Sequence, residues 1–419
     1  MGGVTMAGKS YAVRVRSDRA RLWATGRPPL VRLDIELTER CNNDCVHCNV
    51  NLPAGDRTAR GREMTADVVG GILEEAAALG CLTVRFTGGE PLLREDFEDI
   101  YLRARKLGLK VLLFTNATLI SPRLAGLMKR IPPLEPIEVS VYGTSEKSSG
   151  AVTRNPVAFE AARRGLALLV ENGLPFVVKG ALLPATRGEV EELEGLARRL
   201  AGADGTPSYS LLFDLRSRRD GAKNDLIRSL RIGPAEFLAI SARGGPAVLE
   251  EWRALALEFS GACGDRLFDC LAAGGTGSVD AYGVFQCCLG LRHPETVCDL
   301  EGGSLREAMT VFLPKVRALR AADRGYLERC GRCPLKGLCH QCPAKSWAEH
   351  GTLDTPVEYF CGIAHAQAEA IGLLAAGEKA WGVRDWPARL ERLASHKGSG
   401  PKTGRAAGKK ADGGLSWKI

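Results

Sequence analysis

Three cysteines near the start of the chain have the spacing of metal ligands: Cys41, Cys45 and Cys48 form a C-x3-C-x2-C motif. Thiolates spaced in this way are typical ligands of iron–sulfur clusters or of zinc. Four protein ligands would close a structural site, whereas three leave one coordination position open for chemistry. The motif therefore predicts a reactive metal centre. A zinc knuckle that takes a fourth ligand from elsewhere in the chain is the alternative.

A second group of cysteines lies in the C-terminal half, where ten of the 14 cysteines fall between Cys263 and Cys361. Its densest part is a Cys-x2-Cys-x5-Cys-x2-Cys run from Cys330 to Cys342, with two glycines and a proline between the cysteines. Such a run has too few apolar residues to build a core, so we expect it to fold around metal. A pair of zinc sites is one interpretation of such a run.

The composition excludes several classes of protein. A chain of 419 residues with 45% hydrophobic residues has room for two domains and a tail. Charged residues interrupt the N-terminal segment, so we expect no signal peptide, and no stretch is long and apolar enough to cross a membrane. Many cysteines in a chain without export signals favour metal binding over disulfides. We therefore expect a cytoplasmic metalloprotein without a membrane partner.

The net charge of +8 comes mostly from the C-terminal tail. Residues 397–419 contain six basic residues, one acidic residue and few apolar ones. This composition is typical of a solvated, disordered tail rather than of an RNA-binding arm. We therefore expect no nucleic-acid partner.

The first half of the chain alternates between strand-like and helix-like patterns. The predicted strands are 31–37, 82–86, 110–114, 137–142, 176–183 and 208–213. The predicted helices are 65–79, 94–107, one that starts at Ser121-Pro122, 156–171 and 187–202. Six strand–helix units in series favour a parallel sheet with right-handed crossovers that curls toward a barrel. The predicted fold class is α/β, a partial (β/α)6 TIM-like barrel followed by a small cysteine-rich cluster-binding domain.

The chemically conspicuous residues follow the predicted strands, at the edge where barrels of this kind place their chemistry. The cysteine motif follows the first strand, Thr87-Gly88-Gly89-Glu90-Pro91 follows the second and Thr115-Asn116 follows the third. This order resembles the core of the radical S-adenosylmethionine (SAM) enzymes, and the resemblance covers about half of the chain. It implies that Cys41, Cys45 and Cys48 bind a [4Fe–4S] cluster whose unique iron chelates SAM.

The same resemblance implies a SAM site. The turn Gly88-Gly89-Glu90 matches the turn that receives the SAM amino group, since glycines permit close approach of the backbone and a carboxylate balances an ammonium. Ser140 matches a position that often contacts the ribose. Gly180 matches a strand that lets the adenine pack close. His47 stands where the family usually has an aromatic residue, and its flat ring is expected to pack against adenine.

The C-terminal cysteines resemble the SPASM extension of radical SAM enzymes, which binds two auxiliary [4Fe–4S] clusters. Carried over by position, the ligands of the first auxiliary cluster are Cys263, Cys270, Cys288 and Cys342. Those of the second are Cys330, Cys333, Cys339 and Cys361. The Gly-x4-Cys spacing favours Cys288 over its neighbour Cys287, and the choice between them stays open. The last spacing of the dense run is one residue shorter than in the family, which also leaves the role of Cys342 open.

These assignments divide the chain into five predicted segments. They are an N-terminal extension (1–30), the radical SAM core (31–215), a connecting helical segment (216–262), the SPASM domain with a C-terminal helix (263–380) and a C-terminal segment with the basic tail (381–419). The run Arg216-Ser217-Arg218-Arg219 is expected to be a solvated surface loop, with binding of an acidic peptide or a carboxylate as the alternative. Asp280 and Tyr282 lie between predicted cluster ligands but need no catalytic role there, so no catalytic acid or base is predicted.

The resemblance implies a radical SAM/SPASM oxidoreductase that cleaves SAM reductively to a 5′-deoxyadenosyl radical and abstracts hydrogen from a substrate. We expect SAM and three [4Fe–4S] clusters as cofactors, and a flavodoxin- or ferredoxin-type electron donor. SPASM relatives mostly modify peptides, so a peptide or protein substrate and a maturase function are the leading interpretation. Oxidation of a small molecule or a tetrapyrrole side chain is the enzymatic alternative. An iron–sulfur electron carrier and a zinc-binding interaction protein are the non-enzymatic alternatives, although a carrier has no need of the Gly-Gly-Glu turn.

Overall fold

The computed structural model describes residues 5–6, 9–10, 29–201, 208–262, 264–268, 270 and 275–395. The chain forms two compact units. Unit 1 consists of Met1–Arg231, Phe268–Leu319 and Trp347–Gly351, and unit 2 of Ile232–Leu267, Arg320–Ser346 and Thr352–Ile419. The described residues of the range 268–319, predicted to belong to the SPASM domain, therefore lie in unit 1.

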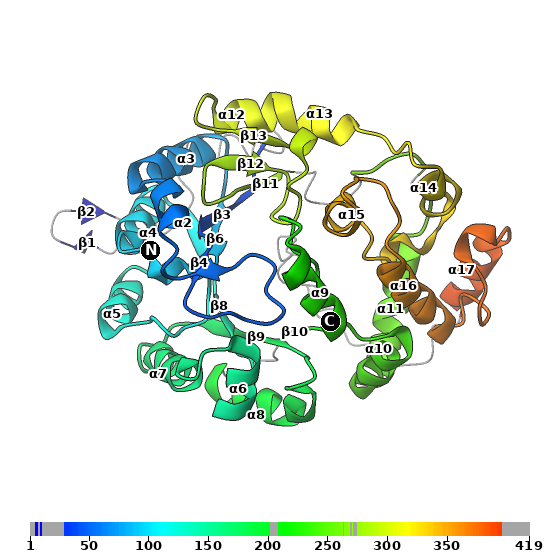
Figure 1. Ribbon diagram of the computed structural model, residues 1–419, viewed down its shortest axis with the longest axis horizontal. Coiled ribbons are helices and arrows are strands. Elements are labelled where there is room, and N and C mark those ends of the chain that lie inside the picture. The colour runs from blue at the N-terminus through cyan, green and yellow to red at the C-terminus, as the bar shows by residue number, and fades with distance from the viewer. Residues whose placement is uncertain are drawn as a thin grey trace. The chain divides into compact units, whose positions relative to one another are not determined.

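Unit 1 is built on a nine-stranded sheet with the order β10-β9-β8-β7-β6-β3-β11-β12-β13 (Figure 1). The strands are β3 (Arg32–Thr38), β6 (Thr83–Gly88), β7 (Lys110–Thr115), β8 (Ile137–Ser140), β9 (Phe176–Ala181), β10 (Ser208–Ser210), β11 (Thr276–Val279), β12 (Val284–Gln286) and β13 (Val297–Asp299). All pairs from β10 to β11 are parallel, whereas β12 and β13 are added antiparallel. The six predicted strands are confirmed, and the predicted partial α/β barrel with them.

The helices of unit 1 lie between the strands in sequence, except α12 and α13, which follow β13. Figure 1 shows α3 to α8 around the outside of the sheet. They are α2 (Arg57–Arg62), α3 (Ala66–Ala78), α4 (Phe97–Lys106), α5 (Pro122–Arg130), α6 (Glu146–Thr153), α7 (Ala158–Glu171), α8 (Val190–Ala201), α9 (Gly221–Leu230), α12 (Leu305–Glu307) and α13 (Leu313–Ala318). Short strands also form, β1 (Thr5–Met6) with β2 (Lys9–Ser10) and β4 (Arg40–Cys41) with β5 (Leu52–Pro53).

Local sequence signals explain where several helices begin. The side chain of Thr65 caps α3 by accepting a hydrogen bond from the Val68 N–H, and Ser121 caps α5 in the same way with Pro122 in the first turn. The helix predicted from residue 94 starts later, at Phe97, because Pro91–Leu93 forms a separate 3-10 turn.

The two faces of the sheet differ in polarity, as alternation along each strand requires. Leu33, Ile35 and Leu37 of β3 are fully buried, and so are the alternate residues of β6 and β7. On β3 and β6 the residues between them include charged ones that pair: the Arg85 guanidinium lies 3.0 Å from the Asp34 carboxylate on the neighbouring strand. Ion pairs therefore order part of this second face, where Arg85 also lies 4.7 Å from the centroid of the Phe114 ring.

Unit 2 is helical and contains the dense cysteine run. Its elements are α10 (Pro234–Ser241), α11 (Pro246–Glu258), α14 (Arg324–Glu328), α16 (Glu358–Ala370) and α17 (Trp386–Ser395), while α15 (Pro343–His350) begins in unit 2 and ends in unit 1. The run itself forms only two 3-10 turns, Cys330–Arg332 and Leu335–Gly337. Glycine is required at Gly337, because a Cβ there would lie 2.1 Å from the Leu255 carbonyl oxygen of α11. The run thus packs closely on helix backbone without building a core of its own.

Candidate functional site

The three N-terminal cysteines lie on one short loop that leaves the sheet at the end of β3. Cys41 ends β4, and the Cys48 N–H donates to the Cys45 carbonyl at 3.1 Å. The loop is fixed from outside, since the N–H groups of Asp44 and Val46 donate to the carbonyls of Thr153 and Val152, both at 2.9 Å. The Val46 side chain packs against an apolar cluster that includes Val152, Leu183, Phe213 and Ile227.

The three thiols share one electrostatic environment. Burial, together with the neighbouring charges of Glu90 and Cys48, raises the pKa of Cys41 to about 12. Burial also raises the pKa of Cys45, where the charges of both other thiols add to the effect. Three thiolates this close repel one another, so a cationic centre is what would keep them deprotonated together.

Protein N–H groups point at the sulfur atoms. The Asn43 N–H donates to Cys41 Sγ at 3.4 Å, the Asn51 N–H donates to Cys48 Sγ at 3.4 Å, and Asn116 Nδ2 lies 3.8 Å from Cys41 Sγ. Such contacts around thiolates orient metal ligands and tune the metal. The donor set therefore fits a thiolate-bound metal centre.

The turn Gly88-Gly89-Glu90 packs directly against the start of the cysteine loop. A Cβ on Gly88, which has φ +118°, would lie 2.1 Å from the Thr38 carbonyl oxygen, and one on Gly89 would lie 2.2 Å from that of Arg40. The Gly89 N–H donates to the Thr38 carbonyl at 2.7 Å, and the Glu90 N–H donates to the Arg40 carbonyl at 2.9 Å. Both glycines are therefore needed by the protein's own backbone, because they hold the turn beside Cys41.

Glu90 is fully buried and ties the ends of β6 and β7 together. Its carboxylate accepts hydrogen bonds from Thr115 Oγ1 at 2.8 Å and from the Asn116 N–H at 2.7 Å. Burial raises the pKa of Glu90 to about 7, against the opposing effect of these hydrogen bonds. The carboxylate and Cys41 thus share Asn116 as a neighbour.

Ser140 ends β8 and lines a cavity of about 460 Å³ together with Asn43, Asn116 and Tyr142. Gly180 lies in β9, where a Cβ would be 2.8 Å from the Tyr209 ring and 3.0 Å from the Leu193 side chain. The missing side chain of Gly180 thus makes room for a neighbouring strand and for α8.

His47 lies in the cysteine loop with its ring against Tyr142, at 4.7 Å between centroids, and Phe213, at 5.4 Å. Burial lowers the pKa of His47 to about 4, so the imidazole is neutral near pH 7. Its Nδ1 atom is buried and has no hydrogen-bond partner among the residues that the structure describes.

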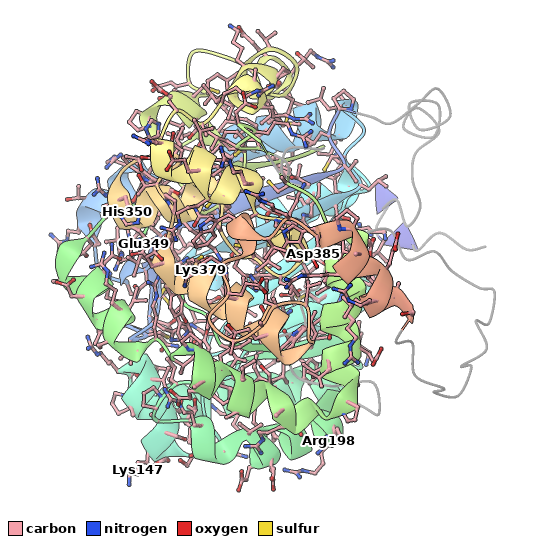
Figure 2. The ribbon with its side chains drawn as sticks, turned by 90° about the vertical axis from the view of Figure 1, so that its right-hand side faces the viewer. Lys147, Arg198, Glu349, His350, Lys379 and Asp385 are labelled. Carbon is pink, nitrogen blue, oxygen red and sulfur yellow. The ribbon has the colours of Figure 1, made fainter. Side chains whose placement is uncertain are left out.

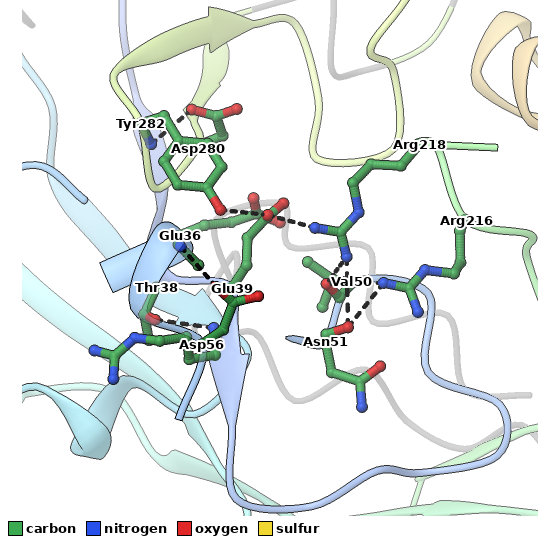
Figure 3. Close-up of polar contacts among 12 residues, drawn as sticks. Glu36, Thr38, Glu39, Val50, Asn51, Asp56, Arg216, Arg218, Asp280 and Tyr282 are labelled. Atoms are coloured by element: carbon green, nitrogen blue, oxygen red, sulfur yellow. Dashed lines mark hydrogen bonds and ion pairs between the residues drawn. The ribbon is translucent and has the colours of Figure 1, made fainter. Parts of the chain in front are cut away.

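A buried network of acids and arginines next to the loop was not predicted from the sequence (Figure 3). Glu39 is 1% exposed and accepts hydrogen bonds from Arg218, from the Tyr282 hydroxyl at 2.8 Å and from Arg292 at 2.6 Å. Arg292 also donates to Glu36 at 2.5 Å. These partners are up to 256 residues apart in sequence, so no local pattern could have revealed them.

Two arginines of this network hold the loop that follows Cys48. Arg216 donates to the Asn51 carbonyl at 2.8 Å, and Arg218 donates to the Val50 carbonyl (Figure 3). The prediction of a solvated loop is wrong for both, because the Arg216 side chain is 6% exposed and that of Arg218 is 26% exposed. Unsatisfied carbonyls of the loop attract the guanidinium groups inward.

Four cysteines of unit 2 lie near one another: Cys330, Cys333, Cys339 and Cys361, here called the unit 2 cysteine set. Burial raises the pKa of Cys333, and the charges of the other three thiols add to this effect. The Cys333 N–H donates to the Cys330 carbonyl at 3.2 Å, which folds the Cys-x2-Cys segment back on itself. The chemistry of this set fits a cluster bound by four thiolates.

The first predicted auxiliary set stays a prediction, because Cys263 lies outside the described residues. Of its other members, Cys270 and Cys288 belong to unit 1 and Cys342 to unit 2. The neighbouring Cys287 thiol and burial raise the pKa of Cys288, and the Leu291 N–H donates to the Cys288 carbonyl at 3.2 Å. Among the described residues, no three His, Cys, Asp or Glu side chains converge on the position of a single metal ion. In an iron–sulfur cluster each cysteine binds a different iron, so the thiols need only face a common space.

Comparison with known proteins identifies the first part of the chain. Residues 35–198 match the family model described as the Radical SAM superfamily. The AdoMet-dependent heme synthase of Methanosarcina barkeri is 29% identical over 206 residues, which cover 48% of this chain and 54% of the relative. The PqqA peptide cyclase of a Methylobacterium species is 30% identical over 222 residues, 49% of this chain and 54% of the relative. The chain thus spans about half the length of these curated relatives.

Solved structures resemble more of the chain. SuiB of Streptococcus suis bound to S-adenosylmethionine matches with a TM-score of 0.58 at 16% identity, over 79% of this chain and 77% of that one. The structure named anSMEcpe with bound AdoMet matches with a TM-score of 0.59 at 16% identity, over 87% of this chain and 98% of that one. At this identity the likeness shows the fold, including the C-terminal cysteine-rich region that matches SPASM structures. No helix within the described part of the chain is long and apolar enough to span a bilayer.

Proposed function

Residues 35–198 belong to the radical SAM superfamily, and from that premise we propose that the chain is a radical SAM/SPASM oxidoreductase that matures a peptide or protein. The observation that carries the proposal is the contact between the cysteine loop and the Gly-Gly-Glu turn, which the glycine backbone at Gly88 and Gly89 makes possible. An electron carrier or a zinc knuckle would need the cysteines but not this turn.

In this proposal Cys41, Cys45 and Cys48 hold a [4Fe–4S] cluster and leave one iron for SAM. When bound, the cluster supplies the electron that cleaves SAM, and SAM supplies the 5′-deoxyadenosyl radical that abstracts hydrogen. Asn43, Asn51 and Asn116 hold the sulfur atoms in place through their N–H groups.

The protein side of the SAM site is proposed to consist of Gly88, Gly89 and Glu90 with Ser140 and Gly180. Ser140 supports this assignment because it lines a cavity together with Asn43 and Asn116, which border the cysteine loop. The neutral His47 ring supplies a flat surface and an unpartnered buried nitrogen beside the loop. Asn116 connects Glu90 to Cys41, so the carboxylate positions the turn and the loop relative to each other.

The C-terminal half is proposed to carry two auxiliary [4Fe–4S] clusters. The unit 2 cysteine set holds one of them. The proximity of its thiols supports this assignment, since the charges of the other three raise the pKa of Cys333. Cys263, Cys270, Cys288 and Cys342 hold the other. The spacing Gly283-x4-Cys288 supports Cys288 over Cys287 as the ligand. A flavodoxin- or ferredoxin-type protein is the proposed electron donor.

A peptide substrate is supported by two fold neighbours whose structures hold peptides, SuiB with its precursor peptide SuiA and anSMEcpe with a Cp18Cys peptide. A second candidate is oxidation of a tetrapyrrole. It is favoured by the identity to an AdoMet-dependent heme synthase and to an Fe-coproporphyrin III synthase, 29% over 206 residues and 33% over 141 residues.

The test is anaerobic reconstitution with iron and sulfide, followed by dithionite and SAM. We expect 5′-deoxyadenosine from the wild-type protein and none from Cys45→Ala. Cys298→Ala is the matched control, because Cys298 is partly buried but lies outside every proposed set. This variant should still form 5′-deoxyadenosine. Bound zinc without SAM cleavage would refute the proposal that the chain is a radical SAM enzyme. A mass change in added precursor peptides, but not in porphyrins, would select the peptide substrate, and the reverse would select the tetrapyrrole.

A further inference from the structure

One thiol of the unit 2 cysteine set has a cation directly beside it. Arg329 Nη2 lies 3.8 Å from Cys361 Sγ, within hydrogen-bonding distance for sulfur. The same guanidinium donates two hydrogen bonds to Glu358, at 2.6 and 3.0 Å, and lies 4.6 Å from the centroid of the Trp381 ring. A carboxylate and an aromatic face thus fix the direction in which Arg329 points.

A second N–H group faces the same thiol from the next turn of α16. His365 is four residues after Cys361, so both side chains lie on one face of the helix. His365 Nε2 accepts a hydrogen bond from the Ala380 N–H at 3.2 Å, which places the ring proton on Nδ1. That Nδ1–H is 2.8 Å from the Cys361 carbonyl oxygen and 3.6 Å from Cys361 Sγ.

The charge of Glu358 does not cancel that of Arg329 at the sulfur. The Glu358 side chain is 72% exposed, whereas that of Arg329 is 28% exposed. Water therefore screens the carboxylate more than the guanidinium, which itself contacts the thiol. Lys379, labelled in Figure 2, adds a second cation 6.0 Å from the Trp381 ring centroid. The surroundings of Cys361 are thus cationic.

We propose that Arg329 and His365 are positioning residues that raise the reduction potential of the auxiliary cluster at the unit 2 cysteine set. The inference rests on the proposed function, since it requires a cluster at these thiols. Taking up one electron makes a cluster more negative, so a cation and an N–H group at a ligating sulfur stabilise the reduced form. A raised potential makes this cluster a ready acceptor for the electron that a substrate radical gives up.

The test is a redox titration of the full-length chain monitored by EPR. The first cluster is removed with Cys41→Ala, Cys45→Ala and Cys48→Ala, so that only auxiliary signals remain. Arg329→Gln should lower the midpoint potential of one signal and leave the other in place. The expected change is roughly a tenfold fall in the ratio of reduced to oxidised cluster at fixed potential, which corresponds to about 59 mV for one electron. His365→Phe should lower the same midpoint by less.

Two variants serve as controls. Arg329→Lys keeps the charge and should restore most of the potential. Arg332→Gln removes a charge from the same segment, where Arg332 is exposed, and should change nothing. Unchanged midpoints in both Arg329→Gln and His365→Phe, with iron content intact, would overturn the inference. Loss of the iron in Arg329→Gln but not in Arg329→Lys would overturn it as well, because Arg329 would then hold the cluster rather than tune it.

The failure of the proposed function is recognised separately. If Cys333→Ala with Cys361→Ala leaves the iron content of the chain unchanged, no cluster is bound at these thiols, whatever the midpoints are.

Discussion

Buried charged residues around the cysteine loop form hydrogen bonds with specific protein groups in place of water. Glu39 is almost fully buried but has three donors, Arg218, Tyr282 and Arg292. Arg216 and Arg218 in turn satisfy backbone carbonyls of the loop. A buried charge is tolerated only when it is paired and hydrogen-bonded, so each of these residues depends on the others.

At this scale the first prediction concerns Arg216. Arg216→Met should leave the Asn51 carbonyl with only the longer bond from Arg218, 3.4 Å against 2.8 Å, at a cost of about 1 kcal/mol, and loosen the loop that holds Cys48. We expect a lower melting temperature of the apo-protein and faster iron loss from the reconstituted protein to a chelator. Arg123→Met is the control, because the Arg123 side chain is 81% exposed in its pair with Glu98 and such pairs contribute about 1 kcal/mol or less. Equal effects of the two variants would contradict the role given to Arg216.

The second prediction concerns Glu36. Burial raises the pKa of Glu36 from 4.5 to about 7, in spite of Arg292. A raised folded pKa favours the protonated form, so this contribution to stability is complete below pH 4.5 and is lost as the pH rises through 7. As the pH rises from 4.5 to 8, the free energy of unfolding of the wild-type protein should therefore fall by on the order of 3 kcal/mol, and that of Glu36→Gln should not show this fall.

Urea unfolding at pH 5.5 and pH 8 measures the part of this difference that falls between these pH values, about 2 kcal/mol. The midpoint of Glu36→Gln relative to wild type should move in favour of the variant at the higher pH. A difference that is independent of pH, or that moves the other way, would show that Glu36 does not titrate in this range.

At the scale of elements, the sequence predicted the parts of the fold that local patterns determine. The six predicted strands, β3 and β6 to β10, are confirmed to within a few residues, and Thr65 and Ser121 cap their helices as expected. The addition of β11 to β3 was not predicted, because the two strands are far apart in sequence and their pairing depends on the register of the folded sheet. The buried arginine network was missed for the same reason.

The prediction at this scale concerns the turn that follows β6. Gly89→Ala would place a Cβ within 2.2 Å of the Arg40 carbonyl oxygen, so the turn must move away from the cysteine loop. We expect SAM affinity to fall by at least about tenfold, because a shift that costs 1.4 kcal/mol already has this effect. Calorimetry of SAM binding to the reconstituted protein measures it.

Gly71→Ala is the matched control for Gly89→Ala. Gly71 lies in α3 and a Cβ there would meet nothing within 4 Å. We expect unchanged SAM binding and about 0.5–1 kcal/mol of added stability, because alanine is the better helix former. Weakened SAM binding in both variants would mean that the loss is not specific to the turn.

At the scale of the whole molecule, chemistry-bearing cysteines belong to both compact units. Cys41, Cys45 and Cys48 lie in unit 1, and the unit 2 cysteine set lies in unit 2. If each set binds its own cluster, removing one should leave the others in place. Wild-type protein should bind about twelve irons, as three cubane clusters require.

Variants of each set test this independence. Cys45→Ala and the pair Cys333→Ala with Cys361→Ala should each lower the iron content by about four per chain, whereas Cys298→Ala should not change it. About four irons in the wild-type protein would contradict the two auxiliary clusters but would remain consistent with the cluster at Cys41, Cys45 and Cys48. Loss of all iron in any one variant would contradict independent sites.

The central claim is that the cluster at Cys41, Cys45 and Cys48 has an iron to which SAM binds. The most direct test records the EPR spectrum of dithionite-reduced protein before and after SAM is added. The protein carries Cys333→Ala and Cys361→Ala, so that fewer signals overlap. We predict a SAM-dependent change in one cluster signal, accompanied by 5′-deoxyadenosine. An unchanged spectrum without 5′-deoxyadenosine, in protein that holds its iron, would contradict the claim.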